Sequence, residues 1–214
     1  KMEEKVWKNI KHNNQIQVND IFNISSTHNH IIEKFEDKAR AYIEIQQGCN
    51  HRCTFCIIPF GRGNNRSVPT ETIIHRIKNL VKNNYKEIVL TGVDITDYGK
   101  DLPGMPNLFQ LSRRLLNFIP ELEQLRLSSI DCAEINEDFW PLLNNKRFMP
   151  HLHLSLQSGN NLILKRMKRR HTKQQAIDFC KKVRNYRSDI VFGADIIAGF
   201  PTETDKMFRD SIEL

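Results

Sequence analysis

The sequence predicts an α/β protein whose parallel sheet curls into an open or partial (β/α) barrel. Strand and helix signals alternate along the chain from residue 41 onward, a pattern typical of a parallel sheet with helical crossovers. Parallel strands that are covered by helices on both faces are usually apolar throughout, but the strands expected here alternate apolar and polar residues. One face of the sheet is therefore expected to pack on helices, while the other lines a wet or ligand-filled cavity.

Five short β-rich segments are expected to form the strands: 41–46, 87–91, 124–128, 151–157 and 189–198. The fourth shows the alternation most clearly, because Leu152, Leu154 and Leu156 are separated by single polar residues. Burying so many polar groups in a dry core would be costly, which favours a cavity lined by the polar face. A sheet whose polar face simply meets solvent is the alternative.

Three segments between these strands carry apolar side chains at helical spacing. In the clearest of them, Ile73, Ile77 and Leu80 fall on a single stripe. The same pattern recurs twice further along the chain, at Leu108, Leu111, Leu115 and Leu116 and at Ala176, Ile177, Cys180 and Val183. These segments supply the helices that a parallel sheet needs between its strands.

The composition excludes several classes of protein. The 214 residues include 27% charged and 8% aromatic residues and carry a net charge of +7, as in a globular chain rather than a disordered one. No apolar run approaches the roughly 18 residues that a membrane helix needs, and the first residues form no signal peptide. Five cysteines, three of them within eight positions, do not resemble a secreted disulfide framework, so a reduced, cytoplasmic location is expected.

Residues 1–38 are expected to stand apart from the rest of the chain. The segment 9–30 is rich in Asn and His and has no apolar periodicity, which indicates a linker or the tail of a preceding domain. The chain starts at Lys1, and its last residues have the pattern of a helix that stops at Leu214. A fragment of a longer protein is therefore expected, with residues 39–214 as its main domain.

The strongest chemical signal is the segment GCNHRCTFC, which contains Cys49, Cys53 and Cys56 directly after the first expected strand. Such short spacings place three thiolates on one loop, where they could bind a single metal centre. Structural zinc takes four ligands, usually from two separated cysteine pairs. No second pair exists in this sequence, although His51 or a distant histidine could supply a fourth ligand. A four-iron cluster bound by only three thiolates would keep one iron open for a small molecule.

The spacing of these cysteines, with Phe55 directly before the third, resembles the signature of the radical S-adenosylmethionine superfamily. The resemblance implies a partial TIM-like barrel with the signature after its first strand. It also implies that Cys49, Cys53 and Cys56 bind a [4Fe–4S] cluster whose open iron holds S-adenosylmethionine. An electron-donor protein would reduce the cluster, and one electron would cleave the cofactor to release a deoxyadenosyl radical.

Within this superfamily, the chain resembles the methylthiotransferases that add a methylthio group to tRNA or to a ribosomal protein. The resemblance is carried by segments that include GCNHRCTFCIIPFGRGNNRSVP, LTGVDITDYG, MPHLHLSLQSGNNLILKRMKRRHT and FGADIIAGFPTET. They are similar to the branch that modifies threonylcarbamoyladenosine beside the tRNA anticodon. The isopentenyladenosine branch typically has GQNVNSY in place of GVDITDY and GFPGET in place of GFPTET. That branch and the ribosomal-protein branch are the alternatives.

The same resemblance implies a domain arrangement. Residues 1–38 correspond to the end of an N-terminal methylthiotransferase domain and a linker, and residues 39–214 to a radical core domain that is incomplete at its C-terminal end. In the family, three further cysteines of the N-terminal domain hold a second [4Fe–4S] cluster, and a small RNA-binding domain called TRAM follows the core. Neither feature is present in this sequence, so the chain alone is not expected to complete the reaction.

Polar residues and glycines near the ends of three expected strands are the candidates for binding the cofactor. Gly92 and Asp94 follow the second strand, where the resemblance implies contact with the cofactor's ammonium group, and a carboxylate suits a cation. The other candidates lie on the fourth strand and at the end of the fifth: Ser155, Gln157, Asp195 and Gly199. The alternatives are an ordinary turn aspartate and hydrogen-bonded polar core residues. No general base is expected, because a radical reaction depends on positioning.

Positive charge is concentrated between Lys165 and Arg187, where ten Lys and Arg residues accompany a single acidic residue. Phosphate-backbone binding requires such clustering, and the resemblance favours tRNA as the partner. The residues expected to contact RNA are Arg62, Arg66, Lys168, Arg169 and Arg170. One alternative is a solvated helix face, and another is that Arg169 or Arg170 holds the cofactor's carboxylate. A zinc-stabilised nucleic-acid-binding module would also explain this concentration of positive charge.

Overall fold

The computed structural model describes residues 20–25, 27 and 39–214. Most of the segment 1–38, predicted to be a domain end and a linker, lies outside the described residues. The described strands are β1 (Arg40–Gln47), β2 (Arg66–Ser67), β3 (Glu87–Gly92), β4 (Gln124–Leu127), β5 (Ser129–Ile130), β6 (His151–Gln157) and β7 (Val191–Ile196).

Helices separate most of these strands. They are α2 (Ile58–Arg62), α3 (Thr70–Lys82), α4 (Leu108–Phe118), α5 (Trp140–Leu143), α6 (Asn161–Arg166), α7 (Lys173–Tyr186) and α8 (Asp205–Ile212). Short 3-10 turns are η1 (Ile21–Asn23), η2 (Ile95–Asp97), η3 (Cys132–Glu134) and η4 (Glu137–Phe139). None of the described helices is both long enough and apolar enough to cross a membrane.

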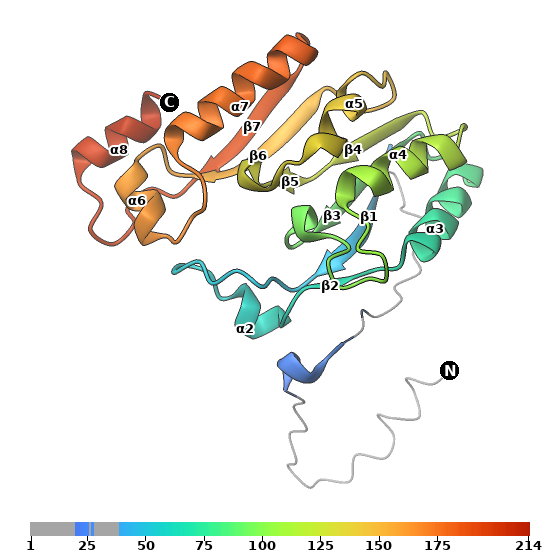
Figure 1. Ribbon diagram of the computed structural model, residues 1–214, viewed down its shortest axis with the longest axis horizontal. Coiled ribbons are helices and arrows are strands. Elements are labelled where there is room, and N and C mark those ends of the chain that lie inside the picture. The colour runs from blue at the N-terminus through green and yellow to red at the C-terminus, as the bar shows by residue number, and fades with distance from the viewer. Residues whose placement is uncertain (1–19, 26, 28–38) are drawn as a thin grey trace, which may run out of the picture.

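The strands form a curled sheet in two parts (Figure 1). Strands β2, β1, β3 and β4 are hydrogen-bonded in that order, and β5, β6 and β7 form the second part. The pairs within both parts are parallel, except that β2 runs antiparallel to β1. Strand β5 follows β4 almost directly along the chain, and Leu125 of β4 forms a parallel bridge with Phe148, which lies just before β6. This curled parallel sheet confirms the predicted α/β fold with a partial barrel.

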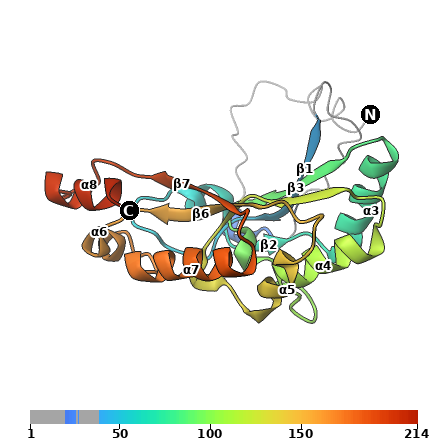
Figure 2. The ribbon, with the colours of Figure 1, turned by 90° about the horizontal axis from the view of Figure 1, so that it is seen from above.

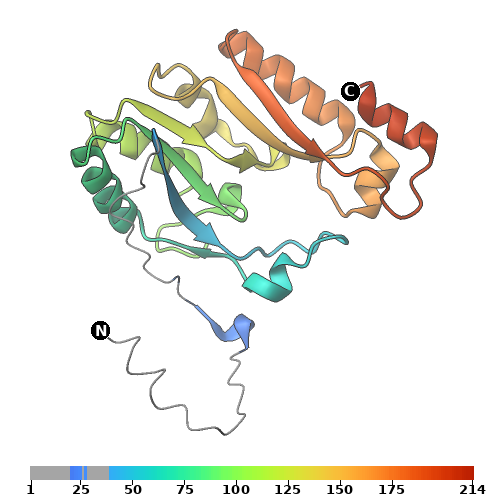
Figure 3. The same cartoon turned by 180° about the vertical axis from the view of Figure 1, so that it is seen from behind.

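Helices α4, α5 and α7 lie on one face of the sheet (Figure 2). Strand β6 turns Leu152 and Leu154 towards that face, where they are 0% and 4% exposed. Burying a leucine side chain fully contributes roughly 1.5–3 kcal/mol, so this alternation fixes which face of the strand is covered. The opposite face, seen in Figure 3, carries the polar residues of β6, which are half-buried: His151, His153, Ser155 and Gln157.

Strand β1 extends the predicted segment 41–46 by one residue at each end and β3 extends 87–91 by one residue, whereas two other predicted segments are shorter strands than expected. The segment 124–128 is strand only from Gln124 to Leu127 (β4). Ser128 lies between the strands and donates its N–H to the carbonyl of Leu90 at 2.9 Å, and the separate strand β5 begins at Ser129. The segment 189–198 is strand only from Val191 to Ile196, and Asp189 instead pairs with Arg187 at 3.0 Å.

Gln46 also departs from the expected alternation of β1. Strict alternation with Ile43 and Ile45 would put Gln46 on the polar face, but the register of β1 against β3 shifts between Glu44 and Gln46, and Gln46 is fully buried. A bulge of this kind re-aims the side chains that follow it. Gln46 is therefore directed into the interior at the point where β1 leads into the cysteine segment.

Helix α7 begins directly after the basic segment 168–171. Thr172 caps its first turn in a reciprocal arrangement with Gln175, in which each side chain bonds the other's backbone N–H. Such a capping box fixes where a helix starts. The residues just before α7 are therefore held in place by the helix that follows them.

Candidate active site

The loop of residues 48–57 joins β1 to α2 and carries the three clustered cysteines. Gly48 has φ +70°, and a Cβ there would lie 1.9 Å from the carbonyl oxygen of Asn64, so only glycine fits. The Cys49 N–H donates to Gly63 O at 3.1 Å. On the far side of the loop, Thr54 donates to two carbonyls at the end of α6, those of Arg166 and Met167. The loop is thus fixed at both ends.

The three thiols are half-buried and free. Cys49 Sγ accepts the His51 backbone N–H at 3.4 Å and lies 3.6 Å from Asp94 Oδ2. Cys53 Sγ accepts a hydrogen bond from Arg169 Nη1 at 3.8 Å. Burial raises the pKa of the Cys49 thiol to about 12; the His51 N–H opposes this rise, and the Asp94 carboxylate adds to it. A metal must therefore displace the proton when it binds there.

This donor set fits an iron–sulfur cluster better than a single zinc ion. A tetrahedral zinc with bonds of about 2.3 Å to sulfur needs its ligand sulfurs within about 4 Å of one another. Among the described residues, the three cysteines do not form a group whose ligand atoms all lie within 4.8 Å. In a cluster each cysteine binds a different iron, so a wider spacing suits it. Three thiolates, with N–H donors aimed at two of them, fit a [4Fe–4S] cluster with one iron left open.

His51 does not act as a fourth ligand of the loop in this structure. Its Nε2 lies 3.1 Å from Asp94, 3.5 Å from Glu134 and 3.7 Å from Asp97. The nearby carboxylates of Asp94 and then of Glu134 favour the charged imidazole and raise the pKa of His51 to about 10 despite its burial. The imidazolium therefore joins the cysteine loop to the end of β3 and to η3.

The loop after β3 brings Asp94 next to the cysteine loop. The Asp94 N–H donates to Gln46 Oε1 at 2.8 Å, and the Gln46 amide donates in turn to Gly48 O and Asn65 Oδ1, both at 2.6 Å. Gly92 cannot be replaced without a clash, because a Cβ there would meet Gln46 O at 2.6 Å. Asp94 thus lies beside the Cys49 thiol and Gly92 packs against Gln46, while their role in binding a cofactor stays a prediction. Gln46 is a supporting residue that the sequence did not reveal.

Asp131 lies between the sheet and the basic segment. Its Oδ2 accepts from Arg169 at 2.8 Å and from Arg170 at 2.9 Å, and its Oδ1 accepts the Ala133 N–H at 2.9 Å. Burial tends to raise the pKa of Asp131, but the neighbouring His171 and the charges of the two arginines outweigh it and lower the pKa to about 2.

Asp131, Cys132 and His171 also place ligand atoms within 4.8 Å of one another. Because two guanidinium groups already share one carboxylate oxygen of Asp131, a further cation there would be opposed by their charges. We therefore interpret this group as a buried ion-pair cluster.

The remaining predicted cofactor residues are less closely grouped. The Ser155 carbonyl accepts from Arg169 Nη2 at 2.7 Å, which connects it to Cys53, and Gln157 lies two residues further on with φ +69°. Asp195 is 89% exposed and lies 3.7 Å from His153. Gly199 is exposed, and its N–H donates to Glu203. In the described part of the chain, no hydrogen bond or ion pair joins Asp195 or Gly199 to the cysteine loop.

The predicted RNA-binding residues divide into two groups. Arg62, Lys168 and Arg170 are exposed. Arg66 is 5% exposed and donates to the carbonyls of Arg62 and Asn64. The Arg169 side chain is 9% exposed and donates hydrogen bonds to Cys53, Asp131 and the Ser155 carbonyl. Arg66 and Arg169 are therefore committed within the protein. Arg170 is also paired, with Asp131 and Glu134, but its side chain stays 36% exposed. We keep the prediction of RNA contact for Arg62, Lys168 and Arg170, whose side chains reach the surface.

Comparison with known proteins now assigns the class. Residues 43–214 match the Radical SAM superfamily, so the chain belongs to this superfamily of enzymes. The match confirms the resemblance drawn from the cysteine spacing and replaces the alternative of a zinc-stabilised module.

Two relatives carry names that are more specific than the superfamily. The chain is 52% identical over 201 residues to the threonylcarbamoyladenosine tRNA methylthiotransferase MtaB of Rickettsia prowazekii, covering 94% of this chain and 48% of that protein. It is 38% identical over 180 residues to the tRNA-2-methylthio-N(6)-dimethylallyladenosine synthase of Clostridium botulinum, covering 84% of this chain and 39% of that protein. The chain spans about half the length, or less, of these relatives.

A solved structure agrees in fold. The radical S-adenosylmethionine methyltransferase TsrM of Kitasatospora setae, determined with cobalamin and a [4Fe–4S] cluster bound, superposes with a TM-score of 0.66 at 15% identity. The match covers 80% of this chain and 33% of TsrM. At this identity the likeness concerns the fold alone, and it supports the partial barrel.

Proposed function

We propose that this chain is the radical core of a tRNA methylthiotransferase that modifies threonylcarbamoyladenosine beside the anticodon. The observation that carries the proposal is the loop with Cys49, Cys53 and Cys56, held after the first strand of a partial barrel in a chain 52% identical to an MtaB protein. The proposal extends to a cytoplasmic location and to an electron-donor protein as partner. It also includes a second [4Fe–4S] cluster, in an N-terminal domain of the whole enzyme.

The three cysteines would hold a [4Fe–4S] cluster and leave one iron for the amino and carboxylate groups of S-adenosylmethionine. When bound, the cluster supplies the electron that cleaves a carbon–sulfur bond of that cofactor. The chain's own contribution is to bind and orient. Gly48 shapes the loop, and Gln46 holds the backbone of Asp94 beside the thiols.

Two charged side chains are placed to bind the zwitterionic end of the cofactor. Asp94, 3.6 Å from Cys49 Sγ, would accept from the ammonium group. Arg169 is the better placed of the two candidate arginines for the carboxylate, because its buried Nε has no hydrogen-bond partner within the described protein. Ser155, Gln157, Asp195 and Gly199 would contact the rest of the cofactor from β6 and from the end of β7.

The tRNA would meet the exposed basic residues near this site. Arg62 lies on α2 beside the cysteine loop, and Lys168 and Arg170 lie between α6 and α7. Figure 1 places α2 and α6 on the same side of the sheet, towards the carboxyl ends of its parallel strands. Phosphate contacts there would position the nucleic acid without reading its sequence.

A second candidate within the family is the isopentenyladenosine branch. It is favoured by the 38% identity to the Clostridium botulinum synthase, which is comparable to the 37% identity to the MtaB protein of Bacillus subtilis. A ribosomal-protein substrate is the third candidate.

The cofactor part of the proposal is tested by anaerobic reconstitution of the chain with iron and sulfide. Electron paramagnetic resonance of the reduced protein, with and without S-adenosylmethionine, is expected to give a four-iron signal that shifts when the cofactor is added. A colourless protein with one bound zinc would refute the proposal.

The substrate is tested in a bacterial host that lacks its own tRNA methylthiotransferases. The gene product that contains this chain is expressed there, with Cys53→Ser as the inactive control, and the tRNA nucleosides are analysed by mass spectrometry. A methylthio group on threonylcarbamoyladenosine is expected. The same group on isopentenyladenosine, or on a ribosomal protein with unmodified tRNA, would replace the first candidate by the corresponding alternative.

A further inference from the structure

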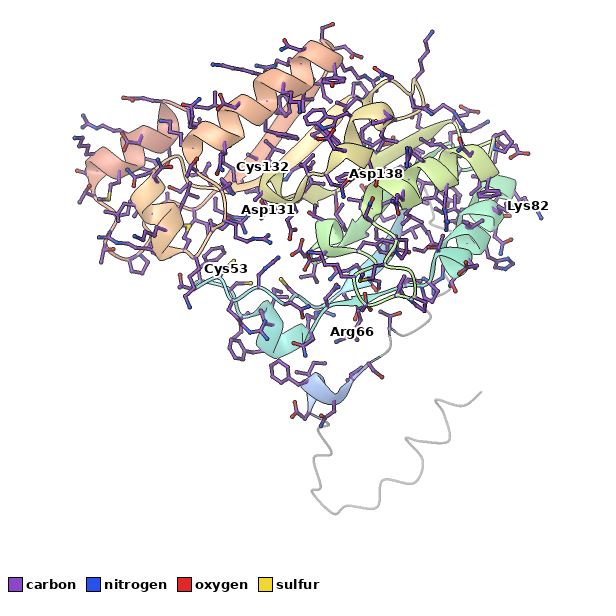
Figure 4. The ribbon with its side chains drawn as sticks, viewed as in Figure 1. Cys53, Arg66, Lys82, Asp131, Cys132 and Asp138 are labelled. Atoms are coloured by element: carbon purple, nitrogen blue, oxygen red, sulfur yellow. The ribbon has the colours of Figure 1, made fainter. Side chains whose placement is uncertain are left out.

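The guanidinium group of Arg169 links the cysteine loop to the sheet. Among the described side chains, no other guanidinium donates hydrogen bonds both to a clustered cysteine sulfur and to the sheet. Arg169 Nη1 donates to Cys53 Sγ at 3.8 Å, and Arg169 Nη2 donates to Asp131 Oδ2 at 2.8 Å and to Ser155 O at 2.7 Å. Figure 4 shows two of the residues that these bonds connect, Cys53 on its loop and Asp131 near the sheet.

The backbone holds Arg169 in this position. Its N–H donates to Leu164 O at 2.9 Å, and Lys168 before it has φ +57°, which reverses the chain direction. Asp131 is itself anchored, because its N–H donates to Thr96 Oγ1 at 3.0 Å and it is 4% exposed. A guanidinium fixed on a buried carboxylate is pre-organised and loses little freedom when it makes a further hydrogen bond.

We propose that Arg169 is a positioning residue for the cluster: acting through Cys53, it raises the reduction potential of the [4Fe–4S] cluster that the three cysteines would hold. This inference rests on the proposed function, since it needs that cluster. Reduction adds a negative charge, and hydrogen bonds to the ligand sulfurs and nearby positive charge favour the more negative state. Because the guanidinium is nine-tenths buried, solvent screens its charge weakly.

Arg170 provides a matched control. It carries the same charge, is next in sequence and donates to the same oxygen, Asp131 Oδ2, at 2.9 Å. It also pairs with Glu134, and it makes no hydrogen bond to a cysteine sulfur in the described structure. A comparison of Arg169→Gln with Arg170→Gln therefore separates the contact with Cys53 from the loss of one positive charge near Asp131.

The test is an anaerobic redox titration of the reconstituted protein without S-adenosylmethionine, followed by electron paramagnetic resonance. At a fixed applied potential near the wild-type midpoint, Arg169→Gln is expected to lower the ratio of reduced to oxidised cluster about tenfold, equivalent to ~59 mV for a one-electron couple. Arg170→Gln is expected to stay within about a factor of two of wild type, and Arg169→Lys to fall between the two glutamine variants.

The outcomes are distinguishable. If wild type assembles no cluster, the proposed function fails. If wild type and Arg169→Gln assemble clusters with the same midpoint, or if Arg170→Gln shifts the midpoint as much as Arg169→Gln does, the role of Arg169 is refuted. Should Arg169→Gln take up too little iron to titrate, Arg169→Lys decides: a lowered midpoint supports the proposal, and a wild-type midpoint overturns it.

Discussion

Replacing Asp131 by asparagine should destabilise the protein through the ion pairs that this residue makes. The substitution keeps the size of the side chain but removes the charge that Arg169 and Arg170 share at 2.8 and 2.9 Å. The Asp131 side chain is 5% exposed, so water cannot replace the lost partner. The two guanidinium groups would then face a neutral amide.

The pKa of Asp131 gives the size of the effect. Burial alone would raise it, but His171 and the arginines lower it from 3.8 to about 2 in the folded protein. A difference of this size corresponds to roughly 2 kcal/mol of stability at neutral pH. Because the folded-state pKa is the lower one, the stabilisation is complete above about pH 4 and is lost as the pH falls through about 2. Removing the carboxylate partner of the buried Arg169 side chain adds to this loss and brings it to about 3–5 kcal/mol at pH 7.

Urea unfolding followed by circular dichroism measures this loss. At pH 7, Asp131→Asn should lower the free energy of unfolding by at least about 2 kcal/mol, and the gap to wild type should narrow as the pH is lowered from 4 towards 2. Asp195→Asn is the matched control, because Asp195 is 89% exposed and its loss should cost less than about 0.5 kcal/mol. If Asp131→Asn unfolds within about 0.5 kcal/mol of wild type at pH 7, the ion-pair argument is wrong.

Three further predictions concern the loop and the helix that follows the basic segment. Gly48→Ala would bring a Cβ to 1.9 Å from Asn64 O, so iron content after reconstitution should fall severalfold, and wild-type iron content would contradict the need for glycine. Cys53→Ser should lose the visible absorption of the cluster, whereas Cys180→Ser, on α7, should keep it; equal loss in both would argue against the assigned ligand. Thr172→Ala removes the N-cap of α7 and should cost about 1 kcal/mol in urea unfolding, while no measurable cost would mean that the cap does not hold the helix start.

Much of the fold could be predicted because its signals are local. The alternation of Leu152, Leu154 and Leu156 with polar residues fixed both the strand and its covered face, and β6 has the predicted bounds. The cysteine loop was also evident from sequence, since its three cysteines lie within eight positions. The bounds of β7 and the bulge at Gln46 were not, because they depend on partners distant in sequence: Gln46 is paired with residues 19 and 48 positions away.

The supporting residues of the site were missed for the same reason. His51 is sequence-adjacent to the cysteines and was considered only as a zinc ligand, yet it pairs with carboxylates from two other segments, at Asp94 and Glu134. Asp131 follows a predicted strand and could have been marked as a candidate by its position at a carboxyl end. Only the folded structure brings the basic segment to it, 38 positions along the chain.

The basic segment shows why charge alone does not assign a binding surface. By composition alone, Lys168 and Arg169 are equally good candidates for phosphate contact. In the fold, Lys168 has a left-handed backbone (φ +57°) and is exposed, whereas the Arg169 side chain is only 9% exposed. A buried arginine must be paired, and its partners here are a carboxylate and a cysteine sulfur rather than a phosphate. The same run of positive charge therefore divides in two: Lys168 faces solvent, where a phosphate could reach it, and Arg169 faces the cysteine loop and Asp131.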